Sequence, residues 1–402
     1  MKKRIVSLLL VLCLALTLLP TVALAAESVD LNGDGVCDTD DAVHLLLHVM
    51  FGPEDYPVPA DTNLDFTNNE EVNTNDAVYL LLHIMFSDAE YPLYPETPAE
   101  STMQPITYTL SFAGDCTLGD DYSVYGASGR FTTIVGSNYS YPFENTMPYF
   151  GQDDFTLVNL EGVFSGPLPP AEKKFRFRGP VDYAKILTAG SVDAVNLANN
   201  HTLDFGTTGY KNTLNALEAE NITYVEDAGT ATFTTQRGLK LGLFSGQFTV
   251  DLADMKKDIQ QLREDGAEII IASFHWGIER SYTPTSDQKK VAHAAIDAGA
   301  DIVVGHHPHV LQPVEEYKNG VIYYSLGNFS FGGNRNPSDK DSVVVQQLVI
   351  REANGTVHLG ETKLIPFRVS SVTNRNDYKP TPYAVDSADY KRAMRKLNGT
   401  YK

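Results

Sequence analysis

The chain has 402 residues, of which 43% are hydrophobic and 20% are charged. This composition is that of a globular protein, and it excludes a disordered polymer, a collagen-like repeat and a disulfide scaffold. The length allows two or three domains of roughly 100–200 residues each. The formal net charge of −20 argues against nucleic-acid binding, which requires a basic surface.

The first 25 residues have the pattern of a secretory signal peptide. A basic start at 2–4 precedes an apolar run over 5–19 and a small-residue site, Ala-Leu-Ala, at 23–25. The apolar run is shorter than the about 20 residues that a membrane span needs. We expect residues 1–25 to be removed, leaving a secreted protein without a membrane span, either extracellular or held at the cell surface.

Residues 28–92 form an acidic module with an internal repeat. Residues 26–100 contain 17 Asp and Glu and no Lys or Arg. The sequence DAVHLLLHVMF at 41–51 recurs as DAVYLLLHIMF at 76–86, with nine of eleven positions identical. A period of 35 residues predicts a duplicated unit. Each copy is predicted to be a short apolar helix preceded by a loop of carboxylates and amides.

Both loops carry oxygen ligands at the spacing of an EF-hand-type Ca²⁺ loop, and Gly35 permits the sharp turn of the first. The predicted ligands of the first loop are Asp30, Asn32, Asp34, Val36 through its carbonyl, Asp38 and Asp41. Those of the second loop are Asp65, Thr67, Asn69, Glu71, Asn73 and Asp76. Glu70 replaces the Gly in the second loop, and a longer loop from Asp61 is an alternative register.

These two loop–helix units resemble a type I dockerin. The resemblance implies Ca²⁺ binding and docking onto a cohesin module of a scaffold or cell-surface protein, as in a cellulosome. Dockerin helices commonly carry Lys or Arg at partner-facing positions and this module has none, so the cohesin class stays open. Residues 93–105 are rich in Pro, Ser and Thr and are predicted to be a linker.

From 106 to 370, strand-like runs alternate with helical patterns, which predicts an α/β domain. Strands are predicted at 106–112, 155–160, 192–197, 239–244, 268–274, 301–304 and 321–326, and helices at 181–189, 208–220, 251–263 and 286–298. Repeated β–α–β order implies a largely parallel sheet that binds ligands at the carboxyl ends of its strands. Residues 371–402 are predicted to be a C-terminal tail.

Polar residues gather where the predicted strands end. Asp115, Glu161, residues 199–204, His275 and residues 306–309 each follow a strand, and these segments hold five of the ten His. Carboxylate, amide and imidazole ligands without thiolate favour Mn, Fe or Zn, as one ion or two. The sequence therefore predicts a transition-metal site at this edge of the sheet.

Six motifs of this domain resemble those of the bacterial capsule-synthesis CapA family, which is related to poly-γ-glutamate synthesis proteins and has a calcineurin-like metallophosphoesterase fold. The motifs are GDCTLG at 114–119, NLEG at 159–162, ANNHTLDFG at 198–206, HWG at 275–277, GHHPHVLQPVE at 305–315 and YSLGNF at 324–329. The resemblance implies a layered α/β sandwich. The metal ligands that it implies are Asp115, Glu161, Asn200, His275, His307 and His309.

The same resemblance makes His201 a general acid that is oriented by Asp204. One position departs from the phosphoesterase pattern, because Thr117 stands where those enzymes have a His two residues after the first Asp. A single tightly bound metal therefore stays an alternative to two, and His306 is an alternative ligand.

The segment 174–178 alternates basic and aromatic residues, which predicts a strand with its bases on one face. Arg176 and Arg178 are the candidates for binding an anionic polymer, and a solvated edge strand explains the pattern equally well.

Three functions fit these predictions. The first is a scaffold-docked, metal-dependent hydrolase acting on capsule or poly-γ-glutamate at phosphoester or γ-glutamyl linkages. The second is a non-catalytic, metal-stabilised component that binds or exports such a polymer. The third is a cellulosome-associated accessory protein in polysaccharide breakdown. The His201–Asp204 pair favours the first function, and Thr117 favours the second.

Overall fold

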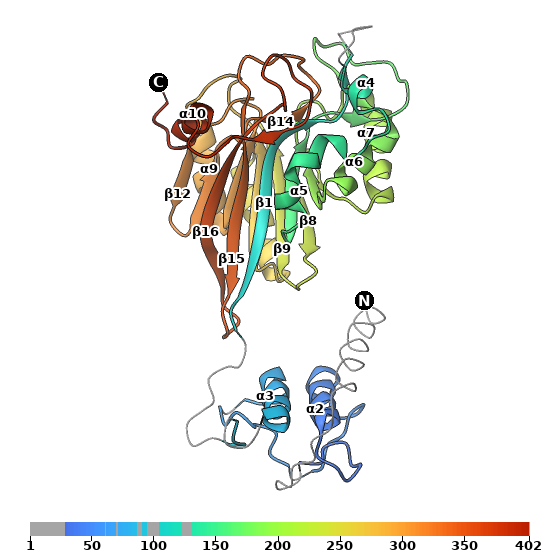
Figure 1. Cartoon of the computed structure of the whole chain (residues 1–402), viewed down its shortest axis with the longest axis vertical. Coiled ribbons are helices and arrows are strands. Elements are labelled where there is room, and N and C mark those ends of the chain that lie inside the picture. The colour runs from blue at the N-terminus through green and yellow to red at the C-terminus, as the bar shows by residue number, and fades with distance from the viewer. Residues whose placement is uncertain are drawn as a thin grey trace. The chain divides into compact units, whose positions relative to one another are not determined.

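The structure is a computed structural model that describes residues 29–60, 62–69, 71–86, 91–94, 104–122 and 130–401. The chain divides into two compact units, one of residues 1–106 with 351–356 and one of residues 107–350 with 357–402 (Figure 1). The predicted signal peptide lies outside the described residues. Within them, no helix is both long and apolar enough to cross a bilayer.

The small unit contains the predicted pair of helices, α2 (Thr39–Phe51) and α3 (Thr74–Phe86). Their contacts repeat at the interval of the sequence repeat. His48 Nδ1 lies 2.7 Å from the carbonyl of Tyr56, and His83 Nδ1 lies 2.7 Å from the carbonyl of Tyr91. The duplication in sequence is therefore a duplication in structure.

The end of the small unit lies beyond the predicted boundary at residue 92. The ring of Tyr94 is 5.5 Å from that of Phe66, and its hydroxyl donates to the carbonyl of Asn63 at 2.8 Å. Tyr94, expected to be the second residue of the linker, thus packs on the core of the small unit. Residues 95–103 of the predicted linker are outside the described residues.

Two main sheets form the large unit (Figure 1). The first has the order β17-β16-β15-β1-β3-β6-β7, with β14 paired to β1, and the second has the order β12-β13-β11-β10-β9-β8. A small third sheet has the order β2-β5-β4.

The strands of the first sheet are β1 (Ile106–Thr117), β3 (Phe155–Leu160), β6 (Ala194–Asn196), β7 (Thr223–Val225), β14 (Asn328–Phe331), β15 (Asp341–Arg351), β16 (Val357–Arg368) and β17 (Thr381–Pro382). Those of the second sheet are β8 (Gly229–Thr234), β9 (Lys240–Gln247), β10 (Ile269–His275), β11 (Ile302–His306), β12 (Val314–Tyr317) and β13 (Gly320–Tyr323). The third sheet consists of β2 (Asp120–Asp121), β4 (Val163–Phe164) and β5 (Phe177–Gly179).

Helices cover the outer face of each main sheet. The helical elements on the first are α4 (Phe131–Val135), η1 (Tyr141–Thr146), α5 (Met147–Phe150), η2 (Val181–Tyr183), α6 (Ala184–Ala189) and α7 (Gly206–Ala219). Those on the second are α8 (Leu252–Glu264) and α9 (Ser286–Ala298). The inner faces meet in aromatic contacts such as Phe155 with Phe233, at 5.0 Å between ring centroids. The layered α/β sandwich expected from the sequence is confirmed.

The only tryptophan of the chain lies in the core of the second sheet. The ring of Trp276 stacks on Phe274, with 4.7 Å between centroids and 9° between planes. Its indole N–H donates to the carbonyl of Tyr324 at 3.0 Å, so the one polar atom of this buried ring has a partner.

Residues 371–402 do not form a separate tail, because they belong to the compact large unit. Their helix, α10 (Ala388–Leu397), carries Lys396, which is only 3% exposed. The Lys396 ammonium lies 2.6 Å from Asp339 Oδ2 and 2.7 Å from Asp341 Oδ2. Burial raises the pKa of Asp341, but the charges of Arg392 and Lys396 outweigh it and hold this pKa below its ordinary value.

We therefore expect Lys396→Met to destabilise the large unit by about 3 kcal/mol, since it removes the buried ammonium that pairs with Asp339 and Asp341 and leaves Arg392 alone to pair with Asp341. Urea denaturation followed by circular dichroism measures the effect, and Lys391→Met on the exposed side of the same helix is the control. Equal unfolding midpoints for the two variants would show that α10 contributes no buried ion pair.

Candidate metal centre

The strand register of the first sheet aligns a row of polar side chains. Asp115 on β1 stands opposite Asn328 on β14 and Asn159 on β3, and Asn159 stands opposite Asn196 on β6. All four side chains are buried. Parallel strands end at the same edge of a sheet, so β1, β3 and β6 bring their polar carboxyl ends together. The strand β14 begins beside them with Asn328.

The second sheet has a matching row, in which His275 at the end of β10 stands opposite His306 on β11. The chain after β11 then takes an unusual path. His307 has a φ of 94° and His309 a φ of 54°, in the left-handed region that side chains other than Gly rarely adopt. This backbone brings the imidazole of His309 to Asp115 and Glu161 and that of His307 to His275, and such strain is common at functional sites.

Close backbone packing beside Asp115 requires glycine. A Cβ on Gly114 would lie 1.9 Å from the carbonyl oxygen of Gly327, and no side chain fits there. That carbonyl accepts the N–H of Asp115 at 2.9 Å. The first Gly of the GDCTLG motif thus allows β1 and the start of β14 to approach each other at the site.

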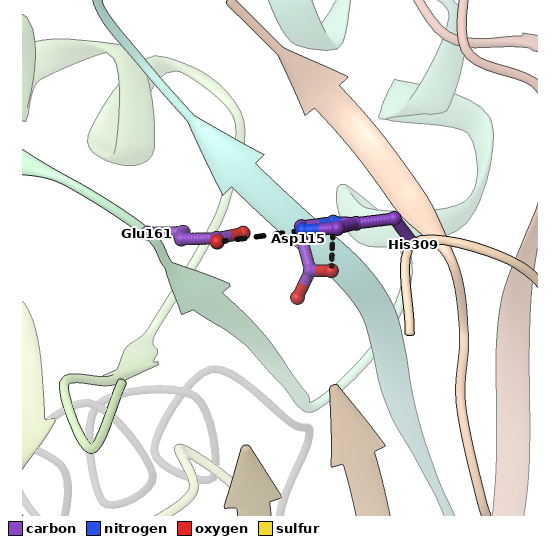
Figure 2. Close-up of side chains that lie close together, drawn as sticks. All are labelled: Asp115, Glu161 and His309. Atoms are coloured by element: carbon purple, nitrogen blue, oxygen red, sulfur yellow. Dashed lines mark ion pairs between the residues drawn. The ribbon is translucent and has the colours of Figure 1, made fainter. Parts of the chain in front are cut away.

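Three of the predicted metal ligands, Asp115, Glu161 and His309, form one cluster (Figure 2). His309 Nδ1 lies 3.2 Å from Asp115 Oδ2, and His309 Nε2 lies 3.8 Å from Glu161 Oε1. The remaining three form a second group beside it. His275 Nε2 is 2.9 Å from the side-chain oxygen of Asn200 and 3.1 Å from His307 Nδ1.

The two groups adjoin, because the amide nitrogen of Asn159 lies 2.8 Å from Asp115 and 3.3 Å from His275. The six ligands predicted from the sequence are therefore all brought to one place. The six predicted ligands form two neighbouring groups, so the geometry is compatible with one metal ion or with two.

Glu161 is the residue whose surroundings most favour a bound cation. Its side chain is fully buried, and neither of its carboxylate oxygens accepts a hydrogen bond from any described residue. Burial, together with the nearby charges of Asp115 and Asp204, raises the pKa of Glu161. A buried carboxylate without donors is costly unless a positive charge compensates it. The donor set of carboxylates, an amide and imidazoles fits Mn, Fe or Zn.

Burial would lower the pKa of His309, but the charges of Glu161 and Asp115 raise it above its ordinary value. The pKa of Asp115 is held well below its usual range although burial opposes this, because His306 and His309 contact the carboxylate. Burial lowers the pKa of His275 strongly. It also lowers the pKa of His307, to about 4. A neutral imidazole is the form that binds a metal.

The catalytic pair predicted from the sequence is in place. His201 Nδ1 lies 2.8 Å from Asp204 Oδ2, and His201 Nε2 lies 3.6 Å from Glu161 Oε1. One ring nitrogen is thus fixed by Asp204, and the other is directed toward the metal cluster. Burial lowers the pKa of His201, and the contact with Asp204 opposes this shift.

Thr117 and His306 are the two positions at which the sequence left the set of metal ligands open. The Thr117 hydroxyl donates to the backbone carbonyl of Glu161 at 2.9 Å, so it supports the loop of Glu161 instead of replacing the missing imidazole. His306 Nδ1 lies 3.5 Å from Asp115 Oδ1, and neither ring nitrogen has a hydrogen-bond partner among the described residues. His306 therefore keeps its place as an alternative ligand.

The basic segment 174–178 differs from the prediction. Only Phe177–Gly179 forms a strand, and Phe177 is buried whereas Phe175 is exposed. The guanidinium of Arg178 contacts Tyr122 and the carbonyl of Gly166. Arg176 Nη1 donates to the carbonyl of Ala171 at 3.4 Å. The prediction of a strand with a basic face is wrong. A strand of only three residues does not make the side chains of the whole segment alternate between two faces.

A cavity of about 130 Å³ lies beside the cluster, lined by His201 and His309 together with Phe175, Phe177 and Phe331. Glu279 and Arg280 also line this cavity, and neither Arg176 nor Arg178 does. Sequence reasoning missed these aromatic walls as well as the roles of Asn159 and Asn328. Asn159 stands in the NLEG motif near the end of β3, and Asn328 stands in the YSLGNF motif at the start of β14. Their place inside these motifs was the available signal.

The chain matches the family described as "Bacterial capsule synthesis protein PGA_cap" over residues 109–333. It belongs to this family. The CapA-type similarity expected from the sequence is therefore confirmed. The match includes every residue of the candidate metal centre and does not include the small unit.

Two relatives of this PGA_cap protein come from Bacillus species. It is 30% identical to "PGA biosynthesis protein CapA" of Bacillus subtilis (strain 168), over 75% of this chain and 80% of the relative. It is 28% identical to "Capsule biosynthesis protein CapA" of Bacillus anthracis, over 72% of this chain and 73% of the relative.

Solved structures similar to this PGA_cap protein include two enzymes. NAD nucleotidase of Haemophilus influenzae aligns with a TM-score of 0.39 and 13% identity, over 74% of this chain and 56% of that one. A purple acid phosphatase of yellow lupin aligns with a TM-score of 0.30 and 9% identity, over 66% and 55%.

We expect metal binding to depend on Glu161. In wild type, millimolar Mn²⁺ should raise the melting temperature, because the ion binds the folded state alone. Glu161→Gln should abolish this rise without lowering the melting temperature in chelator, since it removes an uncompensated buried charge. Calorimetry with and without Mn²⁺ measures both effects, and Glu264→Gln at the exposed end of α8 is the control. An undiminished Mn²⁺ shift in Glu161→Gln would contradict the assignment.

Proposed function

We propose that this PGA_cap protein is a secreted, metal-dependent hydrolase that acts on an anionic cell-envelope polymer, either capsule or poly-γ-glutamate, at phosphoester or γ-glutamyl linkages. The observation that carries the proposal is the buried carboxylate of Glu161, which accepts no hydrogen bond from a described residue and lies beside the His201–Asp204 pair. The names of the two Bacillus relatives, which refer to PGA and to capsule biosynthesis, support the substrate class.

The chain's own residues supply the positioning and the proton transfer. Asp115, Glu161 and His309 would hold one ion, and Asn200, His275 and His307 a second. A bound divalent ion would polarise the scissile group and lower the pKa of a water molecule. Asp204 holds Nδ1 of His201, so Nε2 is left to give a proton to the leaving group. The cavity walls of Phe175, Phe177 and Phe331 would exclude water around the scissile bond.

His201→Ala should leave the metal content nearly unchanged while lowering turnover by about 10²–10⁴, the usual contribution of a positioned general acid. By contrast, His307→Ala and Asp115→Ala should lose metal as well as turnover, because each removes a ligand. Elemental analysis of the purified variants separates the two classes before any substrate is known. Assays on a panel of phosphoesters and poly-γ-glutamate then measure turnover.

Loss of metal in His201→Ala equal to that in His307→Ala would make His201 a ligand and not the acid. Normal metal content in all three variants would remove the metal centre. A non-catalytic role in binding or exporting the polymer would then be favoured, and Thr117 at the place of a phosphoesterase ligand is the observation that supports that role.

We further propose that the small unit binds Ca²⁺ and docks onto a cohesin module of a scaffold or cell-surface protein. Residues that are 35 positions apart make equivalent contacts in the two loops, which supports the same ligand spacing in both. Asp41 Oδ2 accepts the N–H of Asp38 at 2.8 Å, and Asp76 Oδ2 accepts the N–H of Asn73 at 2.9 Å. A third role, as a cellulosome-associated accessory protein, rests on this docking alone.

Helices α2 and α3 should be protected from hydrogen exchange in millimolar Ca²⁺ and exchange freely in chelator, because so many carboxylates repel one another without a cation. Hydrogen exchange measured by mass spectrometry on the full chain reports the protection of both helices, and β10 of the large unit serves as the internal standard. Asp34→Ala should remove the Ca²⁺-dependent protection of α2. Asp55→Ala, at an exposed position outside the loops, is the matched control. Protection that is the same in chelator and in Ca²⁺ would contradict the calcium assignment.

A further inference from the structure

The segment 171–178 lies against the loop that carries His201. The N–H of Ala171 donates to the backbone carbonyl of Asp204 at 2.8 Å, and the N–H of Phe177 donates to Asp204 Oδ2 at 2.6 Å. The Phe177 ring stacks on the imidazole of His201, with 4.1 Å between centroids and 28° between planes. The segment therefore fixes both members of the proposed proton-donating pair.

Lys173 is the charged residue of this segment that reaches the site. Its ammonium forms an ion pair with Asp204 Oδ1, the carboxylate oxygen that His201 does not contact. It also donates to the backbone carbonyl of Asn200 at 2.6 Å. Among the described residues, Lys173 is the only Lys or Arg that pairs with Asp204.

These contacts connect Lys173 with both halves of the site. Asp204 is fully buried, so its second oxygen needs a cation or a donor. The side chain of Asn200 lies 2.9 Å from His275 in the second ligand group. One ammonium thus holds the carboxylate that orients His201 and the backbone of a proposed metal ligand.

We propose that Lys173 is a positioning residue, which fixes Asp204 and the 200–204 loop so that His201 Nε2 is directed at the metal cluster. The proposal rests on the proposed role of His201. Lys173 does not line the cavity beside His201, which separates this role from direct contact with substrate. Its pairing with a buried carboxylate separates it from an ordinary exposed lysine.

Lys173→Met should lower kcat by about 10- to 100-fold, because small displacements of a reacting group are costly, and it should change KM by less than about twofold. Lys173→Arg should restore most of kcat, since a guanidinium can also pair with Asp204. Lys257→Met, at an exposed position on α8, is the matched control and should retain wild-type kcat.

In a His201→Ala background, Lys173→Met should cause no further loss of kcat if it acts through His201. Full additivity of the two losses, or a KM that rises with kcat unchanged, would overturn the positioning role.

A second measurement does not depend on turnover. Ring-nitrogen NMR of ¹⁵N-histidine-labelled full chain, with His201 identified by its absence in His201→Ala, reports how the ring is held. Lys173→Met should shift the His201 signals, and Lys257→Met should leave them in place. If wild type has no turnover and the His201 signals move as expected, the proposed hydrolase fails and the positioning role holds. Unchanged His201 signals in Lys173→Met would overturn the positioning role.

Discussion

The large unit depends on how it compensates negative charge that has been removed from water. Asp115, Glu161 and Asp204 are all fully buried at one edge of the sandwich. A carboxylate in such surroundings must be paired, hydrogen-bonded or protonated. Asp115 is contacted by an amide and two imidazoles, and Asp204 by a backbone N–H, an imidazole and an ammonium. Glu161 has only the imidazoles of His201 and His309 near Oε1, at 3.6 and 3.8 Å, and accepts no hydrogen bond from a described residue. This deficit of donors distinguishes Glu161 from the other two carboxylates.

The backbone brings these groups together through the register of the two sheets. Asp115 lies near the end of β1, Glu161 directly follows β3, and Asp204 lies in the loop between β6 and α7. Burial of the apolar strands carries these segments into the interior. Because neighbouring strands are parallel, a shift of one residue in any pairing would turn a ligand to the other face of its sheet. The apolar cores behind the site therefore specify its geometry as strictly as the polar residues do.

The sequence alone was sufficient to predict features that depend on residues close together in the chain. A strand followed by Asp, Glu or His can be recognised in a short window, so the gathering of polar residues at strand ends was predicted from the sequence. The resemblance to the CapA family then supplied the six predicted ligands and the roles of His201 and Asp204. The partners of those residues are not local. Asn159 and Asn328 contact the site through pairings with β1, and Lys173 reaches Asp204 from a segment without regular structure. Arg176 and Arg178 were misread because their alternation suggested a strand longer than the one that forms. Residues 371–402 were misread because the charges that bind Lys396 lie more than fifty positions earlier in the chain.

The stacked indole of Trp276 has a consequence for spectroscopy. It is the only tryptophan of the chain, it belongs to the large unit, and it directly follows His275. Its intrinsic fluorescence therefore comes from that unit alone, and a paramagnetic ion held by His275 would quench it at short range. The calcium that we propose for the small unit would have no tryptophan beside it. The two proposed metal sites could thus be distinguished optically in a single sample, without a label.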